Sequence, residues 1–313
     1  MVFTPETWPI AANMLSFGNT TPDGTPLLDA PAATWRAQLD EVAGLGFTYV
    51  DPTDAWVSIG ELSAPRFAEF VDAVAASGLA VASISTTRRS VVDATDGERF
   101  CEIGHTIIDR APELGAGIVN FGFMQALTPA QARAGWFWLE DGHVDPPDDS
   151  PVRDLAVERI QELARHGAEV GVEISLEMYE DTFLGTPDRA IRFLKDVDMP
   201  NVGLNPDLGN LVRLHREIED IPTMFAKVLP HTNFWHIKNY LRDIDPATGA
   251  YATAPVPLVM GIVNYRRHIR EAIAAGFTGP FVCEHYGSDS LGVAAINREY
   301  IRDVLRSVPR ETS

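Results

Sequence analysis

Basic residues are scarce in this sequence. The 313-residue chain carries 25 lysines and arginines against 44 aspartates and glutamates, which gives a formal net charge of −19 at pH 7. A nucleic-acid partner needs a basic surface to hold its phosphates, so this balance disfavours nucleic-acid binding. Acidity alone indicates nothing more than a hydrated acidic surface.

Cysteine is rarer still, since the chain contains only Cys101 and Cys283. They lie far apart, in a helix-like and a strand-like segment, which argues against a disulfide framework and predicts two reduced core thiols. No apolar run approaches the roughly 20 residues that span a bilayer. No charged segment followed by an apolar one opens the sequence as an export signal would. We therefore expect a cytoplasmic protein that does not bind membranes.

What the sequence does contain is a regular alternation of strand-like and helix-like segments. Strand-like segments lie within residues 10–16, 47–51, 79–85, 117–122, 172–181, 202–207, 233–238 and 280–284. Such alternation predicts βα units and a parallel sheet. Eight strands with eight helices favour a (β/α)₈ TIM barrel over a doubly wound open sheet, and one such barrel accounts for residues 1–313 as a single domain.

Two connections are longer than the usual few residues. They cover residues 128–151, after the fourth strand, and residues 241–263, after the seventh. In a barrel both lie on the face where active sites are built. The first is interpreted as a lid or partner-binding loop, or else as an inert surface insertion. Its Trp136 and Trp138 are candidates for an aromatic substrate platform or for core packing.

The last four predicted strands each end in a residue that can bind a metal ion. These residues are Glu177, Asp207, His236 and Glu284. A divalent ion such as Mn²⁺ or Mg²⁺ prefers carboxylate oxygen and tolerates imidazole. Three clustered carboxylates are costly to hold together without a cation. Any one of these residues alone could be a cap or a packing residue, but their positions on consecutive strands predict a metal centre.

The chemistry that such a centre supports is enolisation. A metal ion that binds a carbonyl and an adjacent hydroxyl of a sugar stabilises the enediolate formed when a base removes the neighbouring proton. Reprotonation gives epimerisation or isomerisation, and loss of a β-substituent gives elimination. Tyr179 and Lys238 point the same way as Glu177 and His236 by strand alternation. Lys238 is predicted either to polarise a substrate oxygen or to pair with a barrel carboxylate.

The four metal-binding residues, in this order, resemble those of the xylose-isomerase-like barrel superfamily, the sugar phosphate isomerases and epimerases. The segments His236-Ile-Lys238 and Gly203-Leu-Asn-Pro-Asp-Leu-Gly209 strengthen the resemblance, which extends over about residues 8–307. It implies a metal-dependent enzyme of carbohydrate metabolism. The implied cofactor is Mn²⁺, with Mg²⁺, Co²⁺ or Zn²⁺ as alternatives.

The resemblance also implies roles for individual residues. Glu177 and Glu284 would act as catalytic proton-transfer bases, and Arg242 matches a substrate-binding arginine of the ketose epimerases. The full set of expected substrate-binding residues is Lys238, Arg242, Asn210 and Tyr179.

Two positions depart from the family pattern. Ketose 3-epimerases have a glutamate where this chain has Phe183, and they and the DNA-repair members have a histidine where it has Asn210. These departures argue against simple free-ketose epimerisation and against a trinuclear zinc endonuclease.

A narrower resemblance is to the larger subunit of bacterial C-glycoside deglycosidases, which is similar in length and in its long catalytic-face loops. It implies a 3-keto C-glycoside substrate, elimination of the aglycone and a small β-sandwich partner subunit. Alternatives are a keto-sugar isomerase or epimerase, a sugar or cyclitol dehydratase or lyase, and a non-catalytic sugar-binding or assembly subunit. A homo-oligomer or a hetero-oligomer with a small β subunit is expected.

Overall fold

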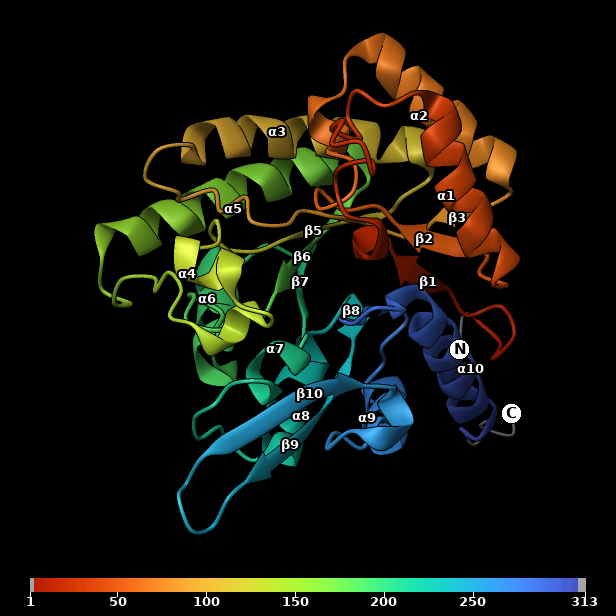
Figure 1. Ribbon diagram of the computed structural model, residues 1–313. Helices are drawn as coiled ribbons and strands as arrows, with labels where there is room; N and C mark the ends of the chain where they lie inside the picture. Colours follow the sequence, from red (N-terminus) through yellow and green to blue (C-terminus); the bar gives the residue numbers. More distant parts are fainter. Residues whose placement is uncertain (1–2, 309–313) are drawn as a thin grey trace, which may run out of the picture.

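The computed structural model describes residues 3–308 and shows a barrel of parallel strands surrounded by helices (Figure 1). The barrel strands are β1 (Ile10–Asn13), β2 (Tyr49–Asp51), β3 (Ala80–Val81), β4 (Ile84–Ser85), β5 (Ile118–Phe121), β6 (Glu173–Glu177), β7 (Val202–Asn205), β8 (Trp235–Ile237) and β11 (Phe281–Cys283). β3 and β4 are two halves of the predicted third strand. The predicted (β/α)₈ barrel is therefore confirmed.

The barrel is assembled from two hydrogen-bonded sheets. One has the order β3-β2-β1-β11-β8 and the other the order β4-β5-β6-β7. Isolated parallel bridges join them at two seams, Thr53 with Ser85 and Leu204 with Thr232. The seams lie at the break between β3 and β4 and between β7 and β8, so the cylinder closes with fewer main-chain hydrogen bonds at these two places.

The long helices pack around the outside of the strands. They are α1 (Ala32–Gly44), α2 (Ala64–Ser77), α3 (Gly97–Arg110), α5 (Pro151–Val170), α6 (Pro187–Val197), α8 (Ile221–Val228), α9 (Tyr265–Ala274) and α10 (Ser290–Arg306). Gly167 is helical within α5, and a Cβ there would lie 2.8 Å from the Val172 carbonyl oxygen. Gly171, with φ of 76°, is the residue that terminates α5. Within residues 3–308, every helix is too short or too polar to serve as a membrane span.

The inside of the barrel changes from apolar to polar along the strand direction. Four apolar side chains form a small cluster apart from the main core: Ala11, Ile118, Phe234 and Val282. Two positions further along the chain, the side chains are polar: Asn13, Asn120, His236 and Glu284. Because side chains two apart on a strand share a face, the same face closes the bottom of the barrel and lines its mouth.

The two long connections contain secondary structure that the sequence did not reveal. The first includes the short helix α4 (Pro129–Arg133) and a 3₁₀ turn at Phe137–Leu139. The second begins with an antiparallel hairpin of β9 (Asn239–Ile244) and β10 (Tyr251–Val256), which projects from the barrel (Figure 1). Pro255 is compatible with β10 because this ribbon has only two strands and the proline needs no second partner.

Asn239 connects the hairpin to the barrel. Its buried side-chain amide donates to the carbonyls of Leu258 and Val263, at 2.8 and 2.9 Å, and its oxygen accepts from the Val263 N–H at 3.1 Å. These bonds fix the chain where it returns from the hairpin to α9.

Asn239→Ala should lower the free energy of unfolding by about 2–4 kcal/mol, because buried main-chain groups lose their partners. Leu241→Ala is the control, since that side chain lies on the same strand and is 49% exposed. Urea denaturation measures both variants. Equal stability of Asn239→Ala and the wild type would show that the hairpin does not depend on this anchor.

Candidate metal centre

The structure brings the four predicted metal-binding residues together at the mouth of the barrel. Glu177 ends β6, Asp207 follows β7 by two residues, His236 lies within β8, and Glu284 directly follows β11. All four side chains are buried, and one ligand atom from each lies within 4.8 Å of the others. Carboxyl ends of parallel strands meet at one end of a barrel, which explains how such distant positions converge.

The protonation of His236 follows from its neighbours. Its Nε2 lies 3.2 Å from Asp51 Oδ2 and 3.2 Å from the Ser85 hydroxyl. Asp51 already accepts from the side chains of Asn13, Ser83 and Ser85. It therefore acts as an acceptor toward His236 as well, and Nε2 carries a proton toward it. Nδ1 lies 3.3 Å from a Glu177 oxygen and 3.4 Å from a Glu284 oxygen without making a hydrogen bond. A histidine held by a carboxylate on one nitrogen, with the other nitrogen among carboxylates, has the arrangement of a metal ligand.

Lys238 also lies within the cluster. Its Nζ donates to Asp207 at 2.5 Å and to Glu284 at 2.7 Å, and the side chain is buried. Of its two predicted roles, the structure shows the pairing with barrel carboxylates. Burial acts to lower the pKa of Lys238, but Asp207 and Glu284 outweigh it and hold that pKa well above its ordinary value. The ammonium group therefore stays charged and balances one of three carboxylates.

The remaining negative charge fits a divalent cation. Burial raises the pKa of Asp207 to about 7, because Lys238 only partly offsets the burial and Glu284 and Glu177 repel further charge. Asp207 Oδ1 is buried among residues 3–308 without a hydrogen-bond partner. An oxygen-rich set with one imidazole suits Mn²⁺ or Mg²⁺. Glu177, Asp207, His236 and Glu284 are thus the residues that would hold such an ion.

Several buried residues that the sequence analysis missed hold the ligands in place. The Asn120 side chain donates to Glu177 Oε2 at 2.9 Å, and the Asn205 side-chain oxygen accepts from the main-chain N–H of His236 at 2.8 Å. Asp51, which orients His236, ends β2 just as the ligands end their strands. That shared position was the signal that could have identified Asp51.

Asn210 is directed at the ligand carboxylates. Its side-chain amide lies 3.2 Å from Glu177 Oε1 and 3.2 Å from Asp207 Oδ2, and it donates to the Met178 carbonyl at 3.0 Å. It also lines the cavity above the centre. The structure therefore places this predicted substrate-binding residue where it orients two ligands.

Arg242 lies away from the cavity. It donates to the main-chain carbonyl of Val212 at 2.9 Å and to those of Leu214 and Arg216, and its guanidinium stacks on Tyr251 at 4.5 Å. These contacts support the segment after the short helix α7 (Gly209–Val212). The substrate-binding role expected for Arg242 stays a prediction.

A cavity of about 450 Å³ opens at the mouth of the barrel, and Glu177, His236 and Glu284 line it. Its polar wall includes Arg88 and Tyr179, whose side chains lie 3.4 Å apart, and its apolar wall includes Phe137 and Tyr286. Trp138 is buried behind this wall, so of its two predicted roles the structure shows packing. Phe183 is buried against other phenylalanines and does not line the cavity.

A buried arginine contacts the first long connection above the mouth. The fully buried Arg213 donates to both carboxylate oxygens of Glu180, at 2.8 and 2.9 Å. The same guanidinium lies over the rings of Phe137 and Trp138, at 4.8 and 5.1 Å from their centroids. We call this group the Arg213 clamp. It fixes the aromatic part of the connection, so this segment forms part of the cavity wall.

Fold and site together define a (β/α)₈ barrel with a candidate metal centre at the carboxyl ends of its strands. A sequence profile of the xylose isomerase-like TIM barrel family matches residues 39–308. The chain belongs to this family, and the resemblance seen in the sequence is confirmed.

Solved structures extend the comparison. A xylose isomerase-like TIM barrel protein from Mycobacterium smegmatis, solved in complex with magnesium, is 60% identical over 98% of this chain and 99% of its own, with a TM-score of 0.94. D-allulose 3-epimerase from Methylomonas sp. is 17% identical over 95% of this chain and 98% of its own, with a TM-score of 0.67. 3-Keto-D-glucoside 4-epimerase from E. coli is 14% identical over 95% of this chain and 100% of its own, with a TM-score of 0.63. The last two likenesses establish the fold.

One curated relative has a named activity. A 128-residue region is 29% identical to 3-dehydroshikimate dehydratase from Bacillus anthracis, and it covers 38% of this chain and 45% of that protein. The matched region thus spans less than half of the relative. The relatives whose activities are named are thus two epimerases, which are similar in fold, and a dehydratase.

Asp51→Asn should weaken Mn²⁺ binding about 10- to 100-fold, because His236 loses the carboxylate that fixes its ring and its proton. Isothermal titration of chelator-treated protein with Mn²⁺ measures the change. Asp23→Asn, in an exposed loop, should bind as the wild type does. Unchanged affinity in Asp51→Asn would contradict the assignment of Nδ1 as the ligand atom.

Arg213→Ala should lower the free energy of unfolding by about 3–5 kcal/mol, because Glu180 is left buried without its partner. Arg216→Ala is the matched control, since its ion pair with Asp181 is exposed and should contribute at most about 1 kcal/mol. Denaturation midpoints compare the two variants. Similar small losses in both would contradict the clamp.

Proposed function

We propose that this protein is a divalent-metal-dependent enzyme that enolises a keto sugar or a 3-keto glycoside. The observation that carries the proposal is the pair of buried glutamates, Glu177 and Glu284, which line a cavity of about 450 Å³ and cluster with Asp207 and His236. A cavity of this volume accommodates a monosaccharide or a small glycoside. Mn²⁺ is the proposed ion.

Proton transfer is assigned to the two glutamates. Burial acts to raise the pKa of Glu177, but His236 and Lys238 outweigh it and bring that pKa to about 2. Glu177 is therefore ionised at neutral pH and can accept a proton from the carbon next to a carbonyl. Glu284, in the same cluster, is assigned the return of a proton to the other face, because epimerisation needs a second acid–base group.

The other residues of the site position the substrate and the bases. A bound divalent ion would supply Lewis acidity to the carbonyl and the adjacent hydroxyl oxygen. Lys238 holds Asp207 and Glu284 by charge-assisted hydrogen bonds. Arg88 and Tyr179, on the polar wall, offer donors for sugar hydroxyls. Likeness in fold to two sugar epimerases is consistent with these roles.

Elimination is a second candidate, favoured by the apolar wall. Phe137 and Tyr286 face the cavity beside Met124 and Leu127. Aromatic side chains of this kind stack on a planar group, such as the aglycone that a C-glycoside deglycosidase releases. Dehydration, the reaction that the name of the Bacillus anthracis relative indicates, would begin here with the same type of proton abstraction. The site chemistry is therefore shared, and the substrate decides the product.

The experiment follows solvent deuterium into the substrate. Mn²⁺-loaded protein in D₂O, given a free ketose, a 3-keto-glucoside or a 3-keto C-glycoside, should exchange the proton next to the carbonyl of at least one of them. A new sugar isomer identifies an epimerase or isomerase, and a released aglycone identifies a lyase. Absence of exchange in all three, from protein that binds Mn²⁺, would falsify the proposal.

Glu177→Gln and Glu284→Gln should each reduce turnover at least about a hundredfold, because each removes a base as well as a ligand charge. Glu173→Gln is the matched control, since Glu173 lies exposed at the opposite end of β6. Initial rates at saturating Mn²⁺ measure the effect. Near-normal rates in both site variants would exclude the roles given to them.

The expected oligomer remains a proposal. Exposed apolar side chains on the hairpin and the segment after it support a partner surface there: Leu241, Ile244, Val259, Met260 and Ile262. Both a second copy of the chain and a small β subunit remain candidates for this surface.

A further inference from the structure

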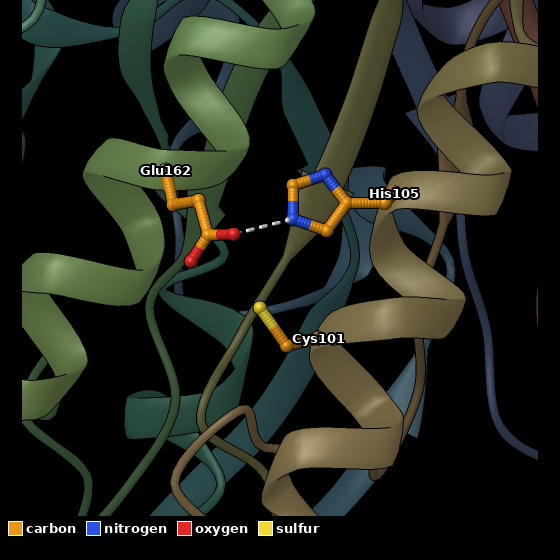
Figure 2. A group of neighbouring side chains, drawn as sticks. All are labelled: Cys101, His105 and Glu162. Atoms are coloured by element: carbon orange, nitrogen blue, oxygen red, sulfur yellow. Dashed lines mark hydrogen bonds and ion pairs between the residues drawn. The ribbon is translucent and has the colours of Figure 1, made fainter.

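A second group of metal-binding side chains lies on the outside of the barrel, between α3 and α5. Cys101 and His105 are one helical turn apart on α3, and Glu162 faces them from α5 (Figure 2). One ligand atom from each lies within 4.8 Å of the others. None of these residues belongs to the centre at the barrel mouth.

His105 belongs to a chain of hydrogen bonds that ends in a carboxylate on each side. Its Nδ1 lies 2.8 Å from Nδ1 of His166, and Nε2 of His166 lies 2.8 Å from Asp109 Oδ1. At the other end, Nε2 of His105 lies 3.2 Å from Glu162 Oε1.

The carboxylates at the two ends of this series of hydrogen bonds determine which imidazole nitrogens carry protons. Asp109 only accepts, so Nε2 of His166 carries a proton; a neutral His166 then has a bare Nδ1. Nδ1 of His105 must therefore donate to it, which leaves Nε2 of His105 bare and facing the Glu162 carboxylate. Two acceptors then face each other, and an additional proton on the ring pair or a cation between them would resolve the conflict.

The third side chain of the group, beside His105 and Glu162, is the thiol of Cys101. Cys101 is 8% exposed, and its sulfur makes no hydrogen bond within residues 3–308. Burial, together with the charge of Glu162, raises the pKa of Cys101 to about 11. The thiol is therefore protonated in the absence of metal, and binding through sulfur releases that proton.

The packing of the two helices makes the convergence possible. Gly104, between the two α3 ligands, faces Leu163 and Phe121, and a Cβ at this position would lie 3.1 Å from each side chain. The absence of a side chain there lets α3 approach α5 closely. The side chain of Glu162 is 55% exposed, so an ion reaches the gap from solvent and the carboxylate is free to adjust to it.

We propose that Cys101 Sγ, His105 Nε2 and the Glu162 carboxylate form a zinc-class metal site, in which His166 and Asp109 orient the His105 ring. Zinc binds thiolate, imidazole and carboxylate at about 2.0–2.3 Å, and three protein ligands leave a fourth position for water. The hydrogen-bonded His166 and Asp109 are the outer partners that metal-binding histidines have. Mn²⁺ and Mg²⁺ prefer oxygen ligands, so the two centres should select different metals.

The absorption spectrum of bound Co²⁺ distinguishes the two sites, because only the site between α3 and α5 contains a sulfur ligand. Chelator-treated full-length protein titrated with Co²⁺ alone should develop a near-ultraviolet thiolate-to-cobalt charge-transfer band, and added Zn²⁺ should remove it. Cys101→Ser should abolish the band, and Cys283→Ala, the other thiol, should keep it. Asp207→Asn impairs only the centre at the barrel mouth and should also keep the band. The experiment therefore tests the site between α3 and α5 independently of the centre at the barrel mouth.

The proposal is overturned if the folded wild type shows no band at millimolar Co²⁺, or if the band survives in Cys101→Ser. Circular dichroism establishes that each variant is folded. Glu162→Gln provides a second test on an exposed position, and it should weaken Zn²⁺ competition at least about tenfold. Glu169→Gln, exposed on the same helix, should leave the competition unchanged; equal affinities in both variants would exclude Glu162 as a ligand.

Discussion

The repulsion among three buried carboxylates at the barrel mouth is the constraint on which the rest of the structure depends. Glu177, Asp207 and Glu284 lie within one cluster, and Lys238 is the ammonium group that contacts two of them. Carboxylates out of water need charge or hydrogen-bond compensation. Asn120 and Asn210 supply donors to them, and a divalent cation would complete the balance. The apolar floor of the barrel then confines this charge to the end that solvent and substrate reach.

The surroundings of the cluster reflect the same requirement. Asp51 fixes the His236 ring from one side, so that the other nitrogen is presented to the carboxylates. The Arg213 clamp keeps aromatic side chains over the cavity, which limits the access of water. Weak dielectric screening under such a cover strengthens every electrostatic interaction with a bound substrate. Ligand positions and loop packing are thus parts of one electrostatic arrangement.

The barrel and its four clustered residues could be predicted because strand periodicity and strand-end position are local signals. Asp51 carried the same signal, but its partner, His236, lies 185 positions away and only the fold shows the contact. The hairpin of β9 and β10 was missed because Pro255 is unfavourable in most strands and tolerated in this two-stranded ribbon. The sequence alone does not show where α5 ends, because Gly167 and Gly171 look alike there and only the structure shows the positive φ of Gly171. Arg242 and Arg213 show that an arginine's contacts depend on which carbonyls or rings the fold brings to it.

The four candidate metal ligands come from both sheets of the barrel, which are joined only by isolated bridges at the two seams. Glu177 and Asp207 come from the β4–β7 sheet. His236 and Glu284 come from the other sheet, in which β11 and β8 are the last two strands. Lys238 already crosses the gap beside β7 to reach Asp207. An ion held by all four residues would therefore join the two halves of the cylinder. Its loss would loosen both the barrel wall and the positions of Glu177 and Glu284.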